Sequence, residues 1–503
     1  MGTPAVRASS SSWVAGLLCG AVLAIYCVVA VVPASRHPNT NGFAAYYTAA
    51  RVLLETPHDL KWVYDNPWFQ RHIDAFGFVR VLDIYNIQPP TMSLMFAPVA
   101  WMSPGRARLV WIVCSVGFWW LGLTLLAGVL ALRRGRVDPR LGLAALTSAY
   151  IPLTDNLHRG QAYALLFFLL CAAIHFASHP NTRKRWLAGV PLGFMLVLKM
   201  AGLWFWPFLL MARRWRIVLT AAATALTVAI LAAPAIGGQP WRIYLEELPR
   251  LASDPVRYVT ANQTVTSLTG HLFVFDARWN PAPIANLRPL AIGLSLAVTV
   301  VALIVSARLQ RLASEERDAR ALSWGLLTSL CVSVTPIAES YHYLLVLPAV
   351  VIAFWWAARR RVSRTSWTAL VLAVLLLITP FRLYGWRSLQ AGWLTLLAYP
   401  RLYGAFALWA WLARALSRYE PDERGHERGE SFSGLRIAGR AFPSEQNLSR
   451  ATTRRADPEP GCGRKGAVRS RGAIGVVPAL IGRGMTIVAL DAVERSAARR
   501  NRG

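Results

Sequence analysis

Side chains that can move protons or bind anions interrupt the long apolar runs of this 503-residue sequence at three places. The first place contains His158 and Gln161, the second Lys199, and the third Glu339 and His342. An imidazole or a carboxylate can act as a general acid or base. A metal site is not predicted, because neither of these histidines has a second histidine four residues away and the six cysteines show no CxxC spacing.

Lys199 is the most unusual of these residues, because it is the only lysine inside an apolar run. Placing a lysine at the centre of a membrane helix costs about 2.5–3.5 kcal/mol on insertion scales. An ammonium aimed at an anionic head group, such as a lipid phosphate, would account for it. The alternative is a side chain that extends along the helix to the membrane interface.

Two aspartates are candidates for a general base. Asp65 follows Val63 and Tyr64, and Asp83 lies in a segment that ends in Pro89 and Pro90, before a short apolar stretch. Partial burial at the mouth of such a stretch raises the pKa of a carboxylate towards the range that a base needs. The simpler interpretation for either aspartate is a cap of a turn at a wet surface.

Amides and hydroxyls are concentrated in residues 261–269, which include Asn262 and Gln263. Such groups suit hydrogen bonds to a sugar or another polyol, although they are equally common in ordinary turns.

The composition indicates a polytopic membrane protein. Hydrophobic residues make up 55% of the chain and charged residues 16%, whereas soluble domains have about 45–50% and 25%. The net charge of +29 does not indicate a nucleic-acid partner, because arginines cluster between the apolar runs, as the positive-inside rule requires.

The apolar runs predict an all-α bundle of about twelve transmembrane helices. Residues 89–102 are too short to span a membrane and predict a re-entrant element. Long outer loops are expected at residues 34–88 and 237–288. The spans are expected within residues 13–32, 109–132, 141–177, 186–211, 217–236, 289–306, 322–334, 343–357, 367–379 and 394–412.

Charge then gives an orientation. The arginine clusters predict that both termini are cytoplasmic, and most carboxylates before residue 418 fall in the segments that this orientation places outside. We therefore predict a transmembrane domain at residues 1–417 in the cell membrane, with its polar site on the outer face. Residues 418–503 are rich in Arg, Glu, Gly, Ser and Pro and predict a largely disordered cytoplasmic tail.

In order and placement, several short motifs resemble the membrane glycosyltransferases of family 87, which have the GT-C fold. The resemblance covers roughly residues 12–415. It rests on the stretch Phe43 to Arg51, Tyr64-Asp65, Pro89-Pro90-Thr91, Ala97-Pro98, Gly160-Gln161, Leu198-Lys199, Asn262-Gln263-Thr264, Thr335-Pro336 and His342. It implies transfer of a sugar, such as mannose or arabinose, from a polyprenyl-phosphate carrier to a lipid or cell-envelope glycan, without a further cofactor.

The resemblance also implies roles for single residues. A carboxylate takes the proton of the acceptor hydroxyl, and the family usually has an aspartate just before the helix that follows residue 42. This sequence reads Asn41-Gly42-Phe43 there, so either Asp83 or Asp65 has taken the role, Asp83 being slightly favoured, or the chain is catalytically altered.

The remaining site residues follow in the same way. Lys199 and His342 would contact the donor phosphate, and Gln161 and Asn262 the sugars. Gln263, His158 and Glu339 complete the candidate substrate-binding set. A multi-span lipid or sugar transporter, and a catalytically inactive family member, are the two alternatives.

Overall fold

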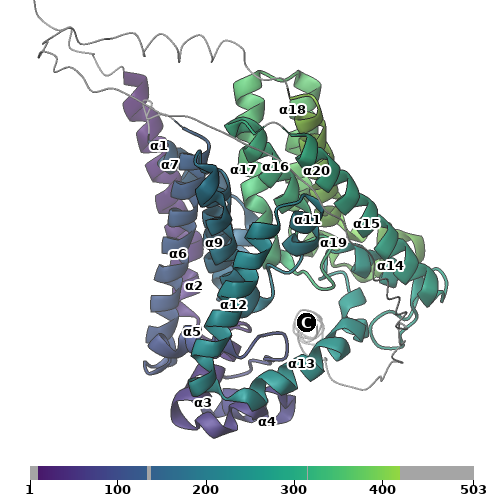
Figure 1. The fold of residues 1–503 in the computed structure, drawn as a ribbon. Helices are drawn as coiled ribbons and strands as arrows, with labels where there is room; N and C mark the ends of the chain where they lie inside the picture. The colour runs from purple at the N-terminus through teal and green to yellow at the C-terminus, as the bar shows by residue number, and fades with distance from the viewer. Residues whose placement is uncertain (1–9, 133–137, 314, 420–503) are drawn as a thin grey trace, which may run out of the picture. The chain divides into compact units, whose positions relative to one another are not determined.

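The computed structural model describes residues 10–132, 138–313 and 315–419, and these residues form helices and connecting loops without a β-sheet. A single antiparallel bridge joins Asp276 and Asn280. The predicted all-α class is therefore confirmed (Figure 1). The predicted tail, residues 418–503, lies outside the described residues except for its first two.

The helices follow one another along the chain with few long connections. The α-helices are α1 (Ser10–Tyr26), α2 (Val32–Arg36), α3 (Phe43–Glu55), α4 (Asn66–Ala75), α5 (Thr91–Ala100), α6 (Pro104–Val129), α7 (Pro139–Ser148), α8 (Ile151–Arg159), α9 (Tyr163–Ala177), α10 (Gly189–Lys199), α11 (Phe205–Met211), α12 (Trp215–Ile236), α13 (Gly238–Ser253), α14 (Val265–Phe273), α15 (Arg288–Leu312), α16 (Arg317–Leu330), α17 (Leu347–Arg360), α18 (Arg364–Leu377), α19 (Phe381–Tyr384) and α20 (Pro400–Ser417). A π-helical segment, Cys27–Val31, joins α1 to α2. Short 3-10 helices occupy Pro57–Tyr64, Thr182–Ala188, Pro255–Tyr258, Ser340–Val346, Arg387–Gln390 and Gly392–Ala398.

Five helical stretches in the described part of the chain are long and apolar enough to cross a membrane. They are Trp13–Arg36, Pro104–Val129, Trp215–Ile236, Arg288–Leu312 and Ser340–Arg360. Thr91–Ala100, Tyr163–Ala177 and Arg364–Leu377 are apolar but shorter. The multi-span character is thus supported, whereas the total of about twelve spans and the re-entrant element stay predictions.

Two apolar runs break into pieces at their polar residues, as their sequences suggest. Residues 141–177 form α7, α8 and α9, and residues 186–211 form a 3-10 helix followed by α10 and α11. Gly160 ends α8 with φ of +66°, and Met200 ends α10 with φ of +52°. These left-handed residues turn the chain so that the ends of α8 and α10 present polar side chains to other elements.

The residues of α3 are alanine- and tyrosine-rich and could form an amphipathic helix at the membrane interface, but the structure places α3 elsewhere. Ten of its thirteen residues are buried, so it lies inside the protein and not with one face along the membrane surface. Its tyrosines pack with neighbouring aromatic rings: Tyr46 lies 4.7 Å from Phe96 of α5, and Tyr47 lies 5.5 Å from Phe78, between ring centroids.

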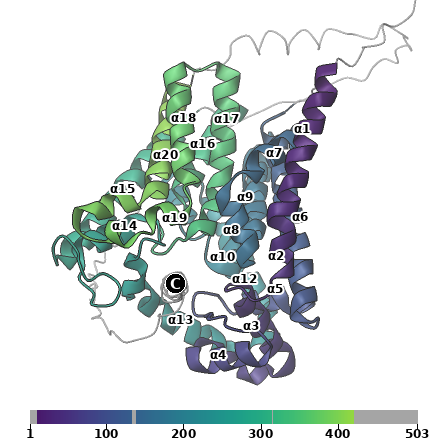
Figure 2. The same ribbon diagram turned by 180° about the vertical axis from the view of Figure 1, so that it is seen from behind.

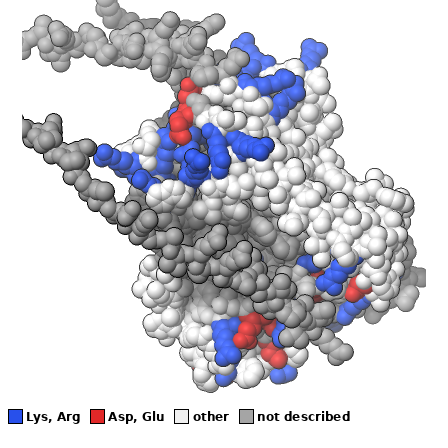
Figure 3. Space-filling model, turned by 45° about the vertical axis from the view of Figure 1, so that its right-hand side comes forward, with Lys and Arg blue, Asp and Glu red and all other residues white. Residues whose placement is uncertain are grey.

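The described helices place the long loops and the short turns at opposite ends. In Figures 1 and 2, α3, α4 and α13 lie at the bottom and the turn from α17 to α18 lies at the top. That turn carries Arg359, Arg360 and Arg361. On the face drawn in Figure 3, charged side chains gather at these two ends and uncharged surface separates them, as expected for a protein that crosses a lipid bilayer.

Candidate active site

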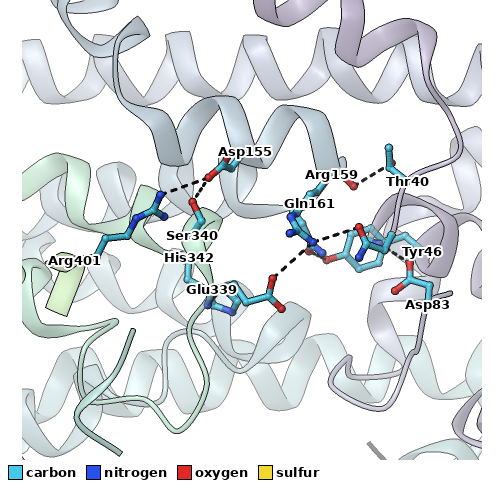
Figure 4. Close-up of polar contacts among 12 residues, drawn as sticks. Thr40, Tyr46, Asp83, Asp155, Arg159, Gln161, Glu339, Ser340, His342 and Arg401 are labelled. Carbon is cyan, nitrogen blue, oxygen red and sulfur yellow. Dashed lines mark hydrogen bonds and ion pairs between the residues drawn. The ribbon is translucent and has the colours of Figure 1, made fainter. Parts of the chain in front are cut away.

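The turn from α8 to α9 forms the centre of a polar cluster (Figure 4). Arg108 of α6, whose side chain is fully buried, donates hydrogen bonds of 2.7 Å to the carbonyls of Leu157 and His158. A Cβ at Gly160 would overlap the Arg108 guanidinium, so the turn requires glycine for space as well as for its positive φ. The turn is therefore fixed, and with it Gln161.

Gln161 links three elements through its amide oxygen. Tyr46 of α3 donates a hydrogen bond of 2.5 Å to it, and the Lys199 ammonium at the end of α10 donates one of 3.1 Å. The same ammonium lies over the rings of Tyr163, 4.8 Å from the centroid, and Tyr46, at 5.4 Å. Lys199 is thus held at its head group and does not extend towards bulk water.

The third predicted segment joins the same cluster. Arg159 lies 3.7 Å from the Glu339 carboxylate and donates a hydrogen bond of 3.3 Å to the Asn41 side chain. The His342 ring stacks on Tyr341, 4.6 Å away between centroids, and packs at a tilt against Tyr163, 4.4 Å away. Because the Glu339 backbone N–H donates to Nδ1 of His342, the neutral ring carries its proton on Nε2 and can donate from there.

Asp83 reaches the cluster from the segment between α4 and α5. Its side chain is buried and its Oδ2 accepts hydrogen bonds from the backbone N–H groups of Gly42 and, at 3.0 Å, Ala45, at the start of α3. Its Oδ1 accepts one from Ile84, also at 3.0 Å. The carboxylate of Asp83 thereby lies beside Gly42, the position before α3.

Gly42 itself has no room for a side chain. Its φ is +95°, and a Cβ there would overlap the Gln161 amide and approach the Arg159 carbonyl to 3.0 Å. An aspartate at position 42 is therefore incompatible with this arrangement. Asp83 supplies a carboxylate at the same helix end from another part of the chain.

The carboxylates of the cluster hold protons more tightly than surface carboxylates. Burial raises the pKa of Asp83 to about 6, although three backbone N–H groups and the nearby Lys199 favour its charged form. Burial likewise raises the pKa of Glu339, against the charges of Arg159 and Lys199. Lys199 interacts electrostatically with both carboxylates, so its single positive charge favours the ionised form of each.

A second polar group extends the cluster away from α3. Ser340 donates to the Asp155 carboxylate, and the fully buried Arg401 lies 3.7 Å from the same carboxylate (Figure 4). The Gln263 side chain accepts a hydrogen bond of 3.2 Å from the Arg401 backbone N–H. The backbone N–H of Gln263 donates one of 2.9 Å to the Ala338 carbonyl. These bonds attach the segment before α14 to the segment that carries Glu339.

The predicted residues therefore divide into several groups. Lys199, Gln161, Glu339, His342 and Asp83 lie in the cluster, whereas Asp65 is an exposed N-cap whose carboxylate accepts from the Trp68 N–H at 2.8 Å. His158 is exposed; its carbonyl accepts from Arg108, and its ring interacts with the backbone of Ala30 outside the cluster. The side-chain amide of Gln263 forms its hydrogen bonds with backbone groups. The buried amide oxygen of Asn262 has no partner within the described chain.

Sequence reasoning missed Tyr46, Arg108 and Arg401 as site-forming residues. Arg401 is a lone arginine inside a run predicted as a span, which was an available signal, whereas Arg108 stands close to Arg106 just before a span and resembles an ordinary flanking charge. Tyr46 gave no such signal. In the described ranges, no three His, Cys, Asp or Glu side chains form a group that could hold a metal ion.

Comparisons with known proteins bear on this cluster. The model of Glycosyltransferase family 87 matches residues 86–336, which include Gln161, Lys199, Asn262 and Gln263. Two polyprenol-phosphate-mannose-dependent alpha-(1-2)-phosphatidylinositol mannoside mannosyltransferases are similar over most of their length. That of Mycolicibacterium smegmatis is 29% identical over 343 residues (62% of this chain and 73% of the relative), and that of Mycobacterium tuberculosis is 23% identical over 369 residues (68% and 81%). No solved structure matches the chain.

Proposed function

Because this chain belongs to glycosyltransferase family 87 and is a membrane glycosyltransferase, we propose that it transfers mannose from a polyprenyl-phosphate carrier to a hydroxyl of a lipid or cell-envelope glycan on the outer face of the cell membrane. The names of both relatives support the sugar and the carrier. The predicted bundle of about twelve helices, with cytoplasmic termini, belongs to the same proposal.

One observation carries the proposal. A lysine in an apolar run is held by Gln161 between two carboxylates, Asp83 and Glu339, whose pKa values burial raises. A cation next to a proton acceptor is the arrangement that glycosyl transfer from a phosphate requires.

Asp83 acts as the general base. It removes the proton from the acceptor hydroxyl while that oxygen forms a bond to the anomeric carbon of the sugar. The bond from this carbon to the phosphate oxygen breaks, and the electron pair leaves with the lipid phosphate. An ionised carboxylate has about four lone-pair positions, and backbone donors use three of them in Asp83, so one remains for the acceptor.

Lys199 and His342 stabilise the leaving phosphate. The ammonium offers positive charge, and Nε2 of His342 offers a hydrogen-bond donor. Gln161 and Asn262 offer amide groups to sugar hydroxyls, and the unpartnered oxygen of Asn262 is suited to accept one. Glu339 holds Arg159 and Lys199 in place.

Transfer assays on membranes that contain the full chain test the function. The membranes receive labelled polyprenyl-phosphate mannose, arabinose or glucose together with native lipid extract. We expect a labelled glycolipid or glycan from the mannose donor. Absence of product from every donor contradicts the proposed transfer reaction. Product from the arabinose or glucose donor alone contradicts mannose as the transferred sugar.

The variant Asp83→Asn tests the base, with Asp65→Asn as the matched control. Removal of a general base costs about 10²–10⁴ in rate, so Asp83→Asn should lower kcat at least about 100-fold and Asp65→Asn should leave it nearly unchanged. The opposite pattern would move the base to Asp65.

A further inference from the structure

A second cluster of charges lies far from Asp83 in the fold, at the meeting point of α9, α11, α15, α16 and the start of α12. It surrounds a small hollow of about 30 Å³ that is partly open to the outside. Among the lining residues are Arg185, Arg214, Arg320, Gln310 and Trp324. This space holds about two water molecules, so a ligand would enter it with one small group, and the candidate active site does not include it.

Positive charge exceeds negative charge in this pocket. Glu315 binds two of the three arginines: it pairs with Arg185, and it lies 2.8 Å from Arg214. The third, Arg320, donates one hydrogen bond of 3.4 Å to the Ser178 carbonyl. Three arginines against one carboxylate leave an excess of two positive charges, which favours an anion.

Two buried polar atoms in the pocket have no partner within the described chain. They are Nε of Arg320, a donor, and the amide oxygen of Gln310, an acceptor. Only 6% of the Gln310 side chain is exposed. A buried polar atom without a hydrogen bond costs free energy, so a ligand that offers both an acceptor and a donor would satisfy this pair.

The pocket lies where the charge pattern predicts the inner membrane surface. Arg185 belongs to the Arg183-Lys184-Arg185 turn, and Arg214 to the Arg213–Arg216 turn, both predicted as cytoplasmic. Basic pockets between membrane helices on this side suit phosphate head groups.

We propose that this pocket binds a phosphate group, carried by the hydroxyl-bearing head group of an anionic phospholipid or present as free phosphate. The arginines bind the phosphate oxygens, and Gln310 accepts from a head-group hydroxyl. Glu315 positions Arg185 and Arg214 while it lowers the affinity through its own charge. This site is independent of the proposed transfer reaction.

Binding to the purified full chain tests the proposal. Short-chain phosphatidylglycerol, short-chain phosphatidylcholine and sodium phosphate are each titrated by calorimetry. We expect phosphatidylglycerol, sodium phosphate or both to bind and phosphatidylcholine not to bind. Binding of phosphatidylglycerol alone identifies the lipid head group, and binding of sodium phosphate with equal affinity identifies free phosphate. Failure of both anions to bind overturns the proposal.

Two double variants with the same charge change localise the binding. Arg185→Gln with Arg214→Gln should weaken it at least about tenfold, since two charge-assisted bonds are lost. Arg183→Gln with Arg216→Gln, on exposed neighbours outside the lining, should change it less than about twofold. Equal effects of the two pairs would overturn the proposal.

Glu315→Gln gives a test in the opposite direction. It leaves all three arginines and removes the competing negative charge, so binding should tighten at least about twofold. If the ion pairs of Glu315 only stabilise the fold, Glu315→Gln will not bind the anion more tightly. That result would overturn the proposal. If the double variant Arg185→Gln with Arg214→Gln does not fold, as shown by loss of cooperative melting, Glu315→Gln still tests whether the pocket binds an anion.

Discussion

Asp83 combines burial with a position at a helix N-terminus, and the two act on its proton in opposite directions. The backbone N–H groups of Gly42 and Ala45 favour the carboxylate, while the loss of water favours the neutral acid. Burial prevails and brings the pKa to about 6. A base with this pKa is ionised at neutral pH and still binds a proton readily, which is the compromise that catalysis needs.

The rate should therefore depend on pH through Asp83. The base works when ionised, so kcat/KM should rise with pH, reach half its maximum near pH 6 and level off above about pH 7. A pH profile measured with saturating acceptor checks this. A profile that is flat between about pH 5 and pH 7 would exclude Asp83 as the base.

The same raised pKa affects stability. Folded Asp83 binds its proton more tightly than the unfolded chain does, so its contribution to stability is present at low pH and is lost as pH rises through about 6. Asparagine carries no charge and its Oδ1 can still accept from Gly42 and Ala45. Only the bond from the Ile84 N–H, worth about 1 kcal/mol, is lost, because the NH2 group cannot accept. Loss of activity in Asp83→Asn should therefore not arise from unfolding, and the melting temperature at neutral pH checks this.

Lys199 offers a second test at the residue scale. Lys199→Met keeps the length of the side chain and removes one charge-assisted contact to the donor phosphate, worth about 1.5–3 kcal/mol. We expect the KM for the donor to rise about 10- to 100-fold, with little change in the KM for the acceptor. Lys184→Met, an exposed lysine in the Arg-rich turn, is the control and should change neither. An unchanged donor KM in Lys199→Met would end the phosphate assignment.

At this scale the sequence identified most of the cluster and missed its connections. Lys199, Gln161, Glu339 and His342 interrupt apolar runs, and that interruption is visible without a structure. Tyr46 is one aromatic residue among many, and only the fold shows that its hydroxyl meets Gln161. Asp83 could be proposed from its neighbours, but its contact with the start of α3 joins residues 38 to 41 positions apart.

The elements that hold the cluster are short helices whose ends are fixed by a few residues. α8 ends at Gly160, and Trp111 and Arg108 of α6 bind the backbone around it. The sequence predicted the break but not that a buried arginine secures it. Apolar periodicity also gave no warning that α3 is buried on nearly all sides, because an alanine- and tyrosine-rich helix suits either a surface or a close helix contact.

A pair of glycine variants tests this account of the turn. Gly160→Ala places a Cβ in a left-handed residue and against Arg108, so we expect a loss of about 1–3 kcal/mol of stability and a lower rate. Gly142→Ala, in α7 with open space around it, should be neutral or stabilise by up to about 1 kcal/mol. Unfolding midpoints of both variants in detergent measure the difference. Equal midpoints would mean that Arg108 does not constrain the turn.

At the scale of the whole molecule, the charged residues on the face drawn in Figure 3 gather at the two ends of the described helices. The cluster around Asp83 lies near α3, and the Arg359–Arg361 turn lies at the other end of the described helices. The sequence indicated which segments lie at the same end of the helices, because the positions of the charged residues between the apolar runs are visible in it. The predicted total of about twelve spans stays a prediction, because the runs at residues 141–177 and 186–211 break into helices shorter than a bilayer-spanning helix.

Cysteine labelling tests the orientation that the proposed outer-face site requires. Arg71→Cys lies on α4 at the end that holds Asp83, and Lys184→Cys lies in the Arg-rich turn before α10, and both positions are exposed. A membrane-impermeant maleimide applied to intact cells should label Arg71→Cys, and should label Lys184→Cys only after permeabilisation, because arginine-rich turns stay on the cytoplasmic side. The unsubstituted chain gives the background from its own cysteines. The reverse pattern would place the transfer site on the cytoplasmic face, where the acceptor would have to be a cytoplasmic-leaflet lipid.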